Sequence, residues 1–229
     1  MKNKAKIRYI ASFLMLTAFL LVLIFWNINS GSVSMTVREV FQILFQKGGD
    51  ETARNIVWSI RLPRILAALI LGGALSVSGF LLQTFFNNPI AGPFVLGISS
   101  GAKLMVALVM VASLGNALRL SSWVMIAAAF VGAMICMGFV ILMSSVIEQM
   151  AMLIVSGVMI GYICSAVTDF IVTFAEDADI VNLHNWSKGS FSGMTWENVK
   201  VMVLVTGIAS IGVFLLSKPI SAYEMGEAY

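Results

Sequence analysis

The chain has 229 residues, of which 59% are hydrophobic and only 11% are charged, and its mean hydropathy is +0.96. Soluble domains carry about 25% charged residues, so a soluble globular protein is excluded and most of the surface should face lipid. The 14 basic and 11 acidic residues leave a net charge of +3, which indicates no nucleic-acid partner.

The residue types that build metal and redox sites are scarce. Cys136 and Cys164 both lie within apolar runs, where a free cysteine behaves as a small hydrophobe, and His184 is the single histidine. We therefore predict no disulfide, no metal site and no cofactor. The sequence also lacks a recognisable nucleophile and base pair, so we do not expect an enzyme.

Six segments approach the roughly 20 apolar residues that a spanning helix needs. They are residues 7–26, 65–86, 94–113, 123–143, 147–174 and 199–217. Irregular backbone cannot face lipid, so we predict six helices and an all-α polytopic membrane protein. The third segment has the weakest pattern, because a lysine and two glycines interrupt it.

The N-terminus reads MKNKAKIR before the first apolar run. A signal peptide shares this pattern, but its apolar core is only about 7–15 residues long, and no convincing cleavage site follows. An uncleaved helix is favoured, and the basic cluster then holds the N-terminus in the cytoplasm. Alternation of six spans places residues 27–64 and 175–198 outside and residues 87–93 inside. The basic cluster comprises Lys2, Lys4, Lys6 and Arg8.

Residues 87–102, NNPIAGPFVLGISSGA, interrupt the apolar chain with backbone breakers. Asn88 precedes Pro89, which disfavours helix at Asn88, whereas Pro93 suits the first turn of a new helix. We predict that these three residues reverse the chain at the inner membrane face. Gly97 and Gly101 would then let the third helix pack closely against its neighbours. An ordinary connecting loop fits the same residues.

Residues 61–102, RLPRILAALILGGALSVSGFLLQTFFNNPIAGPFVLGISSGA, resemble the FecCD-type permeases. These are membrane subunits of ATP-binding-cassette importers for ferric siderophores, haem and cobalamin. Their pattern runs R-L-P-R, a glycine/alanine-rich helix, a glutamine and N-P-L-A-x-P-x-x-L-G-x-x-x-G-A, with Ile90 here replacing a leucine. NWSKGSFSGMTWENV (residues 185–199) and KPISAYEMGEAY (residues 218–229) resemble two further family motifs.

The resemblance implies an importer permease with several partners. A second permease subunit would complete a homodimeric or heterodimeric pore, ATPase subunits would bind the cytoplasmic face, and a substrate-binding protein would dock outside. Ferric siderophore is the preferred substrate class, with haem or cobalamin as alternatives. Family members have about ten spans, so residues 1–229 are expected to be the N-terminal part of a single permease domain, a fragment or a truncated product.

The resemblance also assigns roles outside the membrane core. Arg61 and Arg64, which share a helix face, would form salt bridges to the binding protein, unless they only snorkel to the interface. Residues 175–198 would form a gate at the outer face rather than a merely solvated acidic loop. The gate residues would be Trp186, Gly189 and Ser190.

A coupling region would begin near residue 218 and be cut off at the end of the chain. Pro219 should stop the sixth helix, and Ser221 should cap a new short helix with Glu224 as its capping-box partner. A solvated tail is the alternative. The residues that would contact the ATPase are Glu224, Met225, Gly226 and Glu227.

Two alternative functions remain open on the sequence. A secondary transporter also uses broken, glycine-rich helices, but it more often carries several intramembrane charges. The predicted spans here contain two candidates for such charges, Lys103 and Asp169. Both charges lie near a predicted helix end, where snorkelling accounts for them equally well. A non-transport membrane assembly protein would not need the basic residues of the outer loop.

Overall fold

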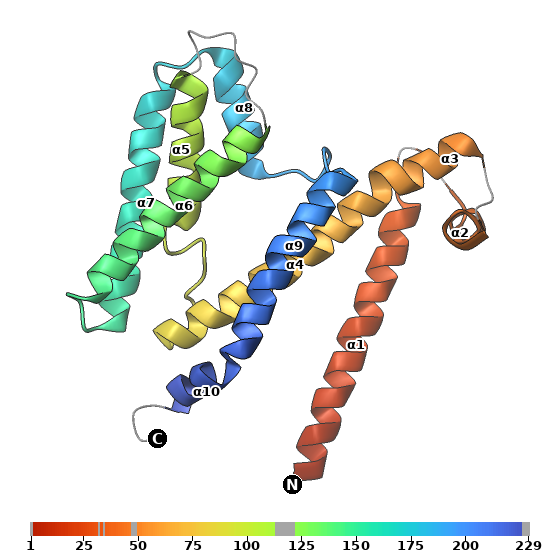
Figure 1. The fold of residues 1–229 in the computed structure, drawn as a ribbon, viewed down its shortest axis with the longest axis horizontal. Coiled ribbons are helices and arrows are strands. Elements are labelled where there is room, and N and C mark those ends of the chain that lie inside the picture. Colours follow the sequence, from red (N-terminus) through yellow and green to blue (C-terminus); the bar gives the residue numbers. More distant parts are fainter. Residues whose placement is uncertain (1, 32, 34, 47–49, 113–121, 226–229) are drawn as a thin grey trace. The chain divides into compact units, whose positions relative to one another are not determined.

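The computed structural model describes residues 2–31, 33, 35–46, 50–112 and 122–225. Over these residues the chain forms helices and turns and no strand (Figure 1). The helices group into two compact units, one of Met1–Gly72 with Phe191–Ala209 and the other of Gly73–Ser190 with Ser210–Tyr229. The fold class is therefore the all-α class that the sequence predicts.

The first unit holds the N-terminal helices. Long helix α1 (Lys2–Asn29) is followed by α2 (Val37–Phe41), which continues directly into the π-helix η1 (Gln42–Gln46). After the gap, α3 (Glu51–Asn55), the π-helix η2 (Ile56–Arg61) and α4 (Leu62–Phe86) follow without a break. Helix α4 continues into the second unit, and α9 (Trp196–Leu215) begins in the first unit and ends in the second.

The second unit holds a group of four adjacent helices, α5 (Ile98–Ala112), α6 (Ser122–Ser144), α7 (Met150–Val172) and α8 (Asp177–Lys188). Helix α5 packs against each of the other three, and α6 also packs against α7. The short helix α10 (Ser217–Met225) ends the described chain.

Five helices are long and apolar enough to cross a membrane: Lys6–Asn29, Glu51–Phe86, Trp123–Ser144, Met150–Val172 and Trp196–Leu215. Five of the six predicted spans are thus confirmed as candidate spans. The predicted span over residues 94–113 is wrong at its start, because α5 begins only at Ile98. The 15 residues of α5 that the structure describes cover about 22 Å at 1.5 Å per residue, less than the roughly 30 Å hydrocarbon core.

Residues 27–64 were predicted as an outer loop, and the structure places four helical segments in them. The second span begins much earlier than residue 65, because α3, η2 and α4 form one uninterrupted helix over Glu51–Phe86. The prediction failed here because Glu51, Arg54 and Arg61 lower the local hydropathy, although every one of them is compatible with a helix.

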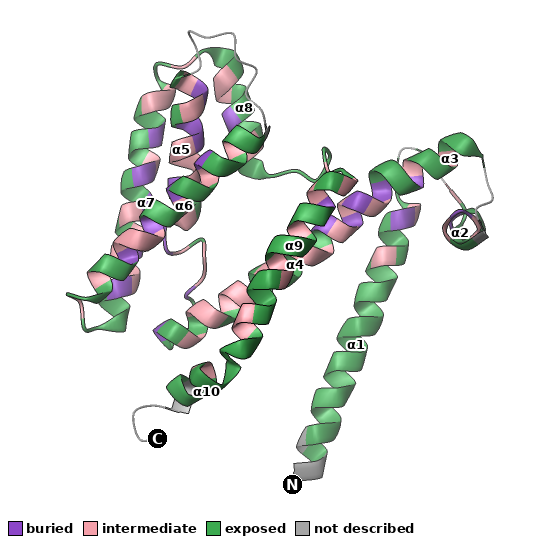
Figure 2. Cartoon of the chain, viewed as in Figure 1, coloured by how far each residue is buried: buried purple, intermediate pink, exposed green. Residues whose placement is uncertain are grey.

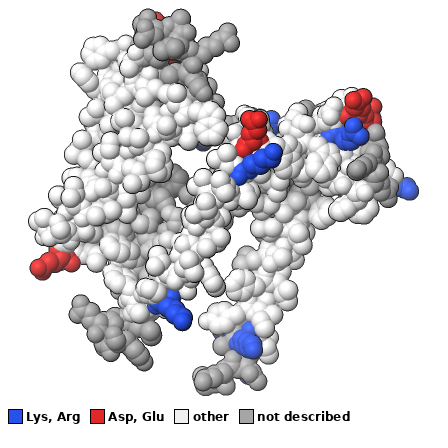
Figure 3. Space-filling view, in the orientation of Figure 1, with Lys and Arg blue, Asp and Glu red and all other residues white. Residues whose placement is uncertain are grey.

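The surfaces of the candidate spans are apolar. None of the most apolar window of α1 is buried among the described residues, and Figure 2 shows that helix exposed along nearly its whole length. In Figure 3 the surfaces of α1 and α9 carry charge only toward their ends. Lipid is the solvent that can accept such uncharged surfaces.

Two hydrophobic clusters hold the second unit together. Phe86, Ala91, Leu96, Val140 and Leu153 form one cluster, which joins the end of α4 to α6 and α7. A second cluster joins α5, α6 and α8, and Val172 and Trp186 pack against it. Its buried members are Val106, Ala107, Met110, Ala128 and Leu183.

Candidate functional site

The segment between α4 and α5 begins with a defined helix end. Asn87 adopts a positive φ of 46°, and its N–H donates to the Thr84 carbonyl at 3.2 Å. The Asn88 N–H donates to the Gln83 carbonyl at 3.1 Å. These two bonds and the left-handed residue make a Schellman motif, which satisfies the last carbonyls of α4.

A tight turn follows, in which Pro89 occupies its second position. The Ala91 N–H donates to the Asn88 carbonyl at 3.1 Å, and the Asn88 side chain accepts from the Ile90 N–H at 2.9 Å. Asparagine before proline is typical of such turns. A second turn contains Pro93, with the Gly92 carbonyl accepting from the Val95 N–H at 3.0 Å. The chain therefore reverses with its backbone largely hydrogen-bonded within the segment.

After the reversal the chain stays non-helical until α5 begins at Ile98, and part of it packs against α7. Ala91 and Leu96 share a cluster with Leu153, in the first turn of α7, and Leu96 also abuts Gly157. A Cβ on Gly97 would lie 2.7 Å from the Gly157 carbonyl oxygen and 2.8 Å from the Gly161 nitrogen. Gly97 also has a φ of 72°, so glycine is required there for both space and conformation.

Helix α5 consequently starts beside the middle of α7. Gly161 is the twelfth of the 23 residues of α7, which places it about 16 Å along that helix at 1.5 Å per residue. Non-helical backbone at such depth is tolerated only where protein buries it or a water-filled cavity borders it. Leu96 and Gly97, which are buried against α7, meet this condition.

The contacts between α5 and α6 are equally close. A Cβ on Gly132 would overlap the Gly101 carbonyl oxygen and lie 2.7 Å from its carbonyl carbon. The Cys136 and Cys164 sulfurs lie 3.7 Å apart beside this contact, and both cysteines are free and buried. A 3.3 Å hydrogen bond between Ser165 and Ser100 joins α7 to α5. The residues of this glycine-lined site are Leu96, Gly97, Ser100, Gly101, Gly132, Gly157, Gly161 and Ser165.

Lys103 and Asp169 lie on two of the helices that build this site. Lys103 lies in the second turn of α5 and is half-buried, and Asp169 lies in the last turn of α7 and is exposed. Neither residue belongs to a group of three or more potential metal ligands among the described residues.

Arg61 lies within the helix rather than at an open helix mouth. Only 8% of its surface is exposed, and its guanidinium donates to the carbonyl oxygens of Ile28 and Val33. Gly31 leaves room for this side chain, since a Cβ there would lie 2.7 Å from Arg61 Nη2. The arginine thus ties the chain that follows α1 to the start of α4, and carbonyl groups of the chain are the partners of its guanidinium.

Arg64 points in a different direction and is half-buried. Its Nη2 donates to the Ser192 carbonyl at 2.6 Å, whereas its buried Nε has no hydrogen-bond partner among the residues that the structure describes. Close by in the sequence, Trp196 Nε1 donates to the Trp58 carbonyl at 2.7 Å. Residues 191–196 are therefore fastened to the helix Glu51–Phe86 at two points.

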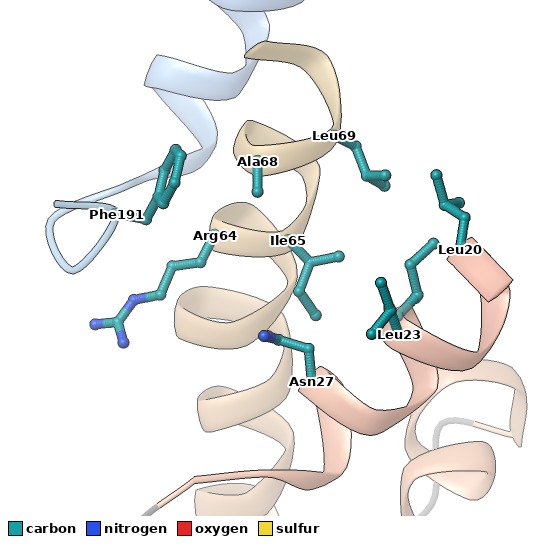
Figure 4. Close-up of a pocket in the computed structure, with 9 residues that line it drawn as sticks. Leu20, Leu23, Asn27, Arg64, Ile65, Ala68, Leu69 and Phe191 are labelled. Carbon is teal, nitrogen blue, oxygen red and sulfur yellow. The ribbon is translucent and has the colours of Figure 1, made fainter. Parts of the chain in front are cut away.

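A groove of about 460 Å³ lies between α1 and α4 (Figure 4). Leucines and isoleucines form most of its lining, and in the close-up the Arg64 guanidinium points away from Leu20, Leu23 and Leu69. The lining therefore offers few polar groups that could select a polar ligand.

The residues predicted to shape a gate surround the end of α8. Trp186 packs against the second cluster, and buried Leu183 belongs to it, so α8 is held on α5. Gly189 ends the helix with a φ of 72°, and its N–H donates to the Trp186 carbonyl at 3.0 Å. Ser190 follows directly. The structure thus contains a short helix after α7, within the residues 175–198 for which the resemblance implies a gate.

The predicted arrangement of the tail is wrong in one respect. Helix α10 begins at Ser217, so Ser221 lies inside the helix and cannot be its N-cap. Pro219 lies in the first turn, where its missing N–H costs nothing. Tyr223 anchors α10 by donating to the Phe85 carbonyl at 2.9 Å. The backbone of Glu224 and Met225 is helical, and Gly226 and Glu227 lie outside the described residues.

Sequence reasoning missed several members of the glycine-lined site. Gly132 has no turn or motif around it, and only its contact with Gly101 marks it. The Cys136–Cys164 contact and the Ser100–Ser165 bond depend on the relative register of three helices. Spacing within one helix contains no information on that register, so no sequence signal could have paired these residues.

The fold and this site define a polytopic α-helical membrane protein with a helix that begins beside the middle of its neighbour. The sequence profile of the FecCD transport family matches residues 19–229. The chain therefore belongs to the FecCD transport family.

Comparison with known proteins gives the same family. The vitamin B12 import system permease protein BtuC of Yersinia enterocolitica is 40% identical over 153 residues, covering 65% of this chain and 44% of its own length. The protein of that name from Citrobacter koseri is 34% identical over 171 residues, covering 75% and 51%. This chain thus spans about half the length of the curated relatives it matches.

A solved structure has the same fold. It is described as an inward-facing conformation of a protein assigned as a metal-chelate type ABC transporter, and it matches with a TM-score of 0.76 at 23% identity. The match covers 93% of this chain and 64% of the solved chain.

Proposed function

We propose that this chain is the N-terminal part of the permease subunit of an ATP-binding-cassette importer in the bacterial cell membrane, with its N-terminus in the cytoplasm. The observation that carries the proposal is the family match over residues 19–229, together with the tightly packed start of α5, where the main family motif ends. The permease would form a pathway with a second permease subunit, and bond chemistry would be left to the partner ATPase.

Ferric siderophores are the proposed substrate class. Cobalamin is the second candidate, because relatives that are 34–40% identical to this chain are named vitamin B12 import system permeases. Haem is the third. All three are large chelates of a metal ion, so a pathway that is shared between two subunits would suit each of them.

The outer residues are proposed to receive the substrate-binding protein and to close the pathway. Arg64 is better placed than Arg61 for a salt bridge to that protein, because it is half-buried and donates to one carbonyl, whereas Arg61 is buried and donates to two. Charge pairs of this kind set docking register and association rate. Trp186, Gly189 and Ser190 would form the outer gate at the end of α8.

The inner residues are proposed to transmit the movement of the ATPase. Asn88, Pro89 and Pro93 would form the inner turn, and Tyr223 fixes α10 to the end of α4 directly before that turn. Helix α10 and the residues after it, including Gly226 and Glu227, would contact the ATPase. A rigid helix is suited to this role because mechanical coupling requires a firm contact.

The test measures growth and chelate uptake of a strain that lacks the gene for this protein. The strain is complemented with that gene or with an empty vector. Iron-starved cells are supplied with one ferric siderophore or with haem, and cobalamin-dependent cells with cobalamin. Loss of uptake of one chelate, restored by the gene, identifies the substrate class. Unchanged uptake of all three chelate classes would refute the proposed substrates.

A second candidate function, a secondary transporter, predicts a different energy source. Uptake through an ATP-binding-cassette importer should persist after a protonophore collapses the proton gradient while ATP is maintained, and it should cease when ATP is depleted. The opposite pattern would favour the secondary transporter.

A further inference from the structure

A ten-residue helical segment between α1 and α3 has both buried and exposed apolar residues. Residues 37–46 run through α2 and η1 without a break. Thr36 caps the segment, with its hydroxyl accepting from the Glu39 N–H at 3.3 Å and its N–H donating to the Glu39 carboxylate at 2.8 Å. These bonds lower the pKa of Glu39 below its usual value. These two hydrogen bonds form a capping box, which is typical of a helix N-terminus.

Protein covers only part of the apolar side of this segment. Val40 and Ile43 are 2% and 1% exposed, and Val40 shares a cluster with Ile28 and Ile65. Leu44 is partly buried against the same cluster. Val37, Phe41 and Phe45 form an uncovered stripe and are 63%, 52% and 72% exposed. The rings of Phe41 and Phe45 lie with their centroids 4.7 Å apart. Arg38 and Glu39, the charged residues of the segment, are both exposed.

The contacts of the segment fix its height along α1. Val40 packs with Ile28, which lies in the last turn of α1, and α1 ends at Asn29. Helix α1 is long and apolar enough to span a bilayer, so its end should lie at the boundary between hydrocarbon and headgroups. Trp26, in that last turn, is 69% exposed, and tryptophan is enriched at this boundary.

We propose that residues 37–46 form an interfacial anchor, which lies along the membrane surface with Val37, Phe41 and Phe45 buried among lipids. A helix of this kind is characterised by an apolar face at the level of the headgroup and acyl boundary and a charged opposite edge. The stripe and the surface of α1 are both exposed and apolar, so lipid is the proposed occupant of both. Arg38 stands beside the stripe, where its guanidinium can reach lipid phosphates.

The test is a measurement of depth with spin labels in liposomes. The full chain carries Cys136→Ala and Cys164→Ala, and a single cysteine replaces Phe41, Phe45 or, as the matched control, Arg38. All three sites are exposed, so the labels leave the buried contacts of Val40 and Ile43 intact. Collision rates with oxygen, which concentrates in lipid, are compared with those of a water-soluble nickel complex.

Labels at Phe41 and Phe45 should favour oxygen over nickel several-fold more than the label at Arg38. Equal ratios at Phe45 and Arg38 would place the stripe in water and overturn the proposal. An immobilised label at Phe45, shielded from both reagents, would show that protein covers the stripe and would overturn it as well. The reading is independent of the substrate and of the energy source for transport.

Discussion

The contact between α5 and α6 can be tested with one methyl group. In Gly132→Ala, the new Cβ would overlap the Gly101 carbonyl oxygen and lie 2.8 Å from Met105 Cγ. Both backbones belong to helices, so the helices must separate, and overpacking of this kind costs typically about 1–3 kcal/mol. Alanine also improves helix propensity over glycine by about 0.5–1 kcal/mol, which partly masks the cost.

Gly138→Ala is the matched control, because it lies on the same helix and a Cβ there meets nothing within 4 Å. Both variants gain the same propensity, so their difference isolates the contact. We expect Gly132→Ala to be less stable than Gly138→Ala by about 1–3 kcal/mol, or about 5- to 150-fold in the unfolding equilibrium constant. The assay is reversible unfolding in mixed micelles with increasing dodecyl sulfate, followed by circular dichroism. Equal stability of the two variants would refute the close α5–α6 contact.

Three further outcomes are expected in the same assay or on intact membranes. Gly97→Ala should lose about 2–5 kcal/mol of unfolding free energy, from its positive φ and from the overlap with α7. Gly92→Ala, whose new Cβ meets nothing within 4 Å among the described residues, should lose much less. Similar losses in the two variants would contradict the contact. Arg61→Gln should cost about 1–3 kcal/mol, because buried carbonyls lose their donor, and wild-type stability would show that the arginine is not structural. Cys136 and Cys164 are buried, so N-ethylmaleimide should modify both only after denaturation; rapid modification in native membranes would contradict their placement.

The spanning helices could be predicted because their signal is local. Length and hydropathy alone mark residues 7–26 and 123–143, and the turn chemistry of Asn88, Pro89 and Pro93 marks the break between α4 and α5. Each of these features depends on residues that are neighbours in the sequence. Helix formation and turn formation follow from such neighbours, so the structure agrees with the prediction at these places.

The depth at which α5 begins could not be predicted. Pro93 suggested a helix starting at the turn, but residues 94–97 are non-helical. Leu96 and Gly97 lie against α7. The cause is tertiary, because Gly97 lies against the backbone of Gly157 and Gly161 with a φ of 72°, a conformation outside the α-helix. A sequence pattern within one segment does not contain the position of another helix.

The environment of Arg61 was also beyond the sequence. Its partners are carbonyl groups at Ile28 and Val33, about 30 residues earlier in the chain. Backbone acceptors have no residue-type signature, so such a partner leaves no trace in composition or spacing. The short helices in residues 37–61 were missed for another reason: charged and polar residues interrupt their apolar residues, which leaves no apolar run as long as a span.

The central claim is that this chain belongs to the permease of an ATP-driven importer. The most direct measurement reconstitutes the permease with its ATPase in proteoliposomes in the presence of the binding protein. It follows uptake of the chelate that the growth experiment identifies. We predict accumulation that requires both ATP and the binding protein and that is lost when the ATPase is inactivated. Accumulation at full rate without ATP would contradict the claim.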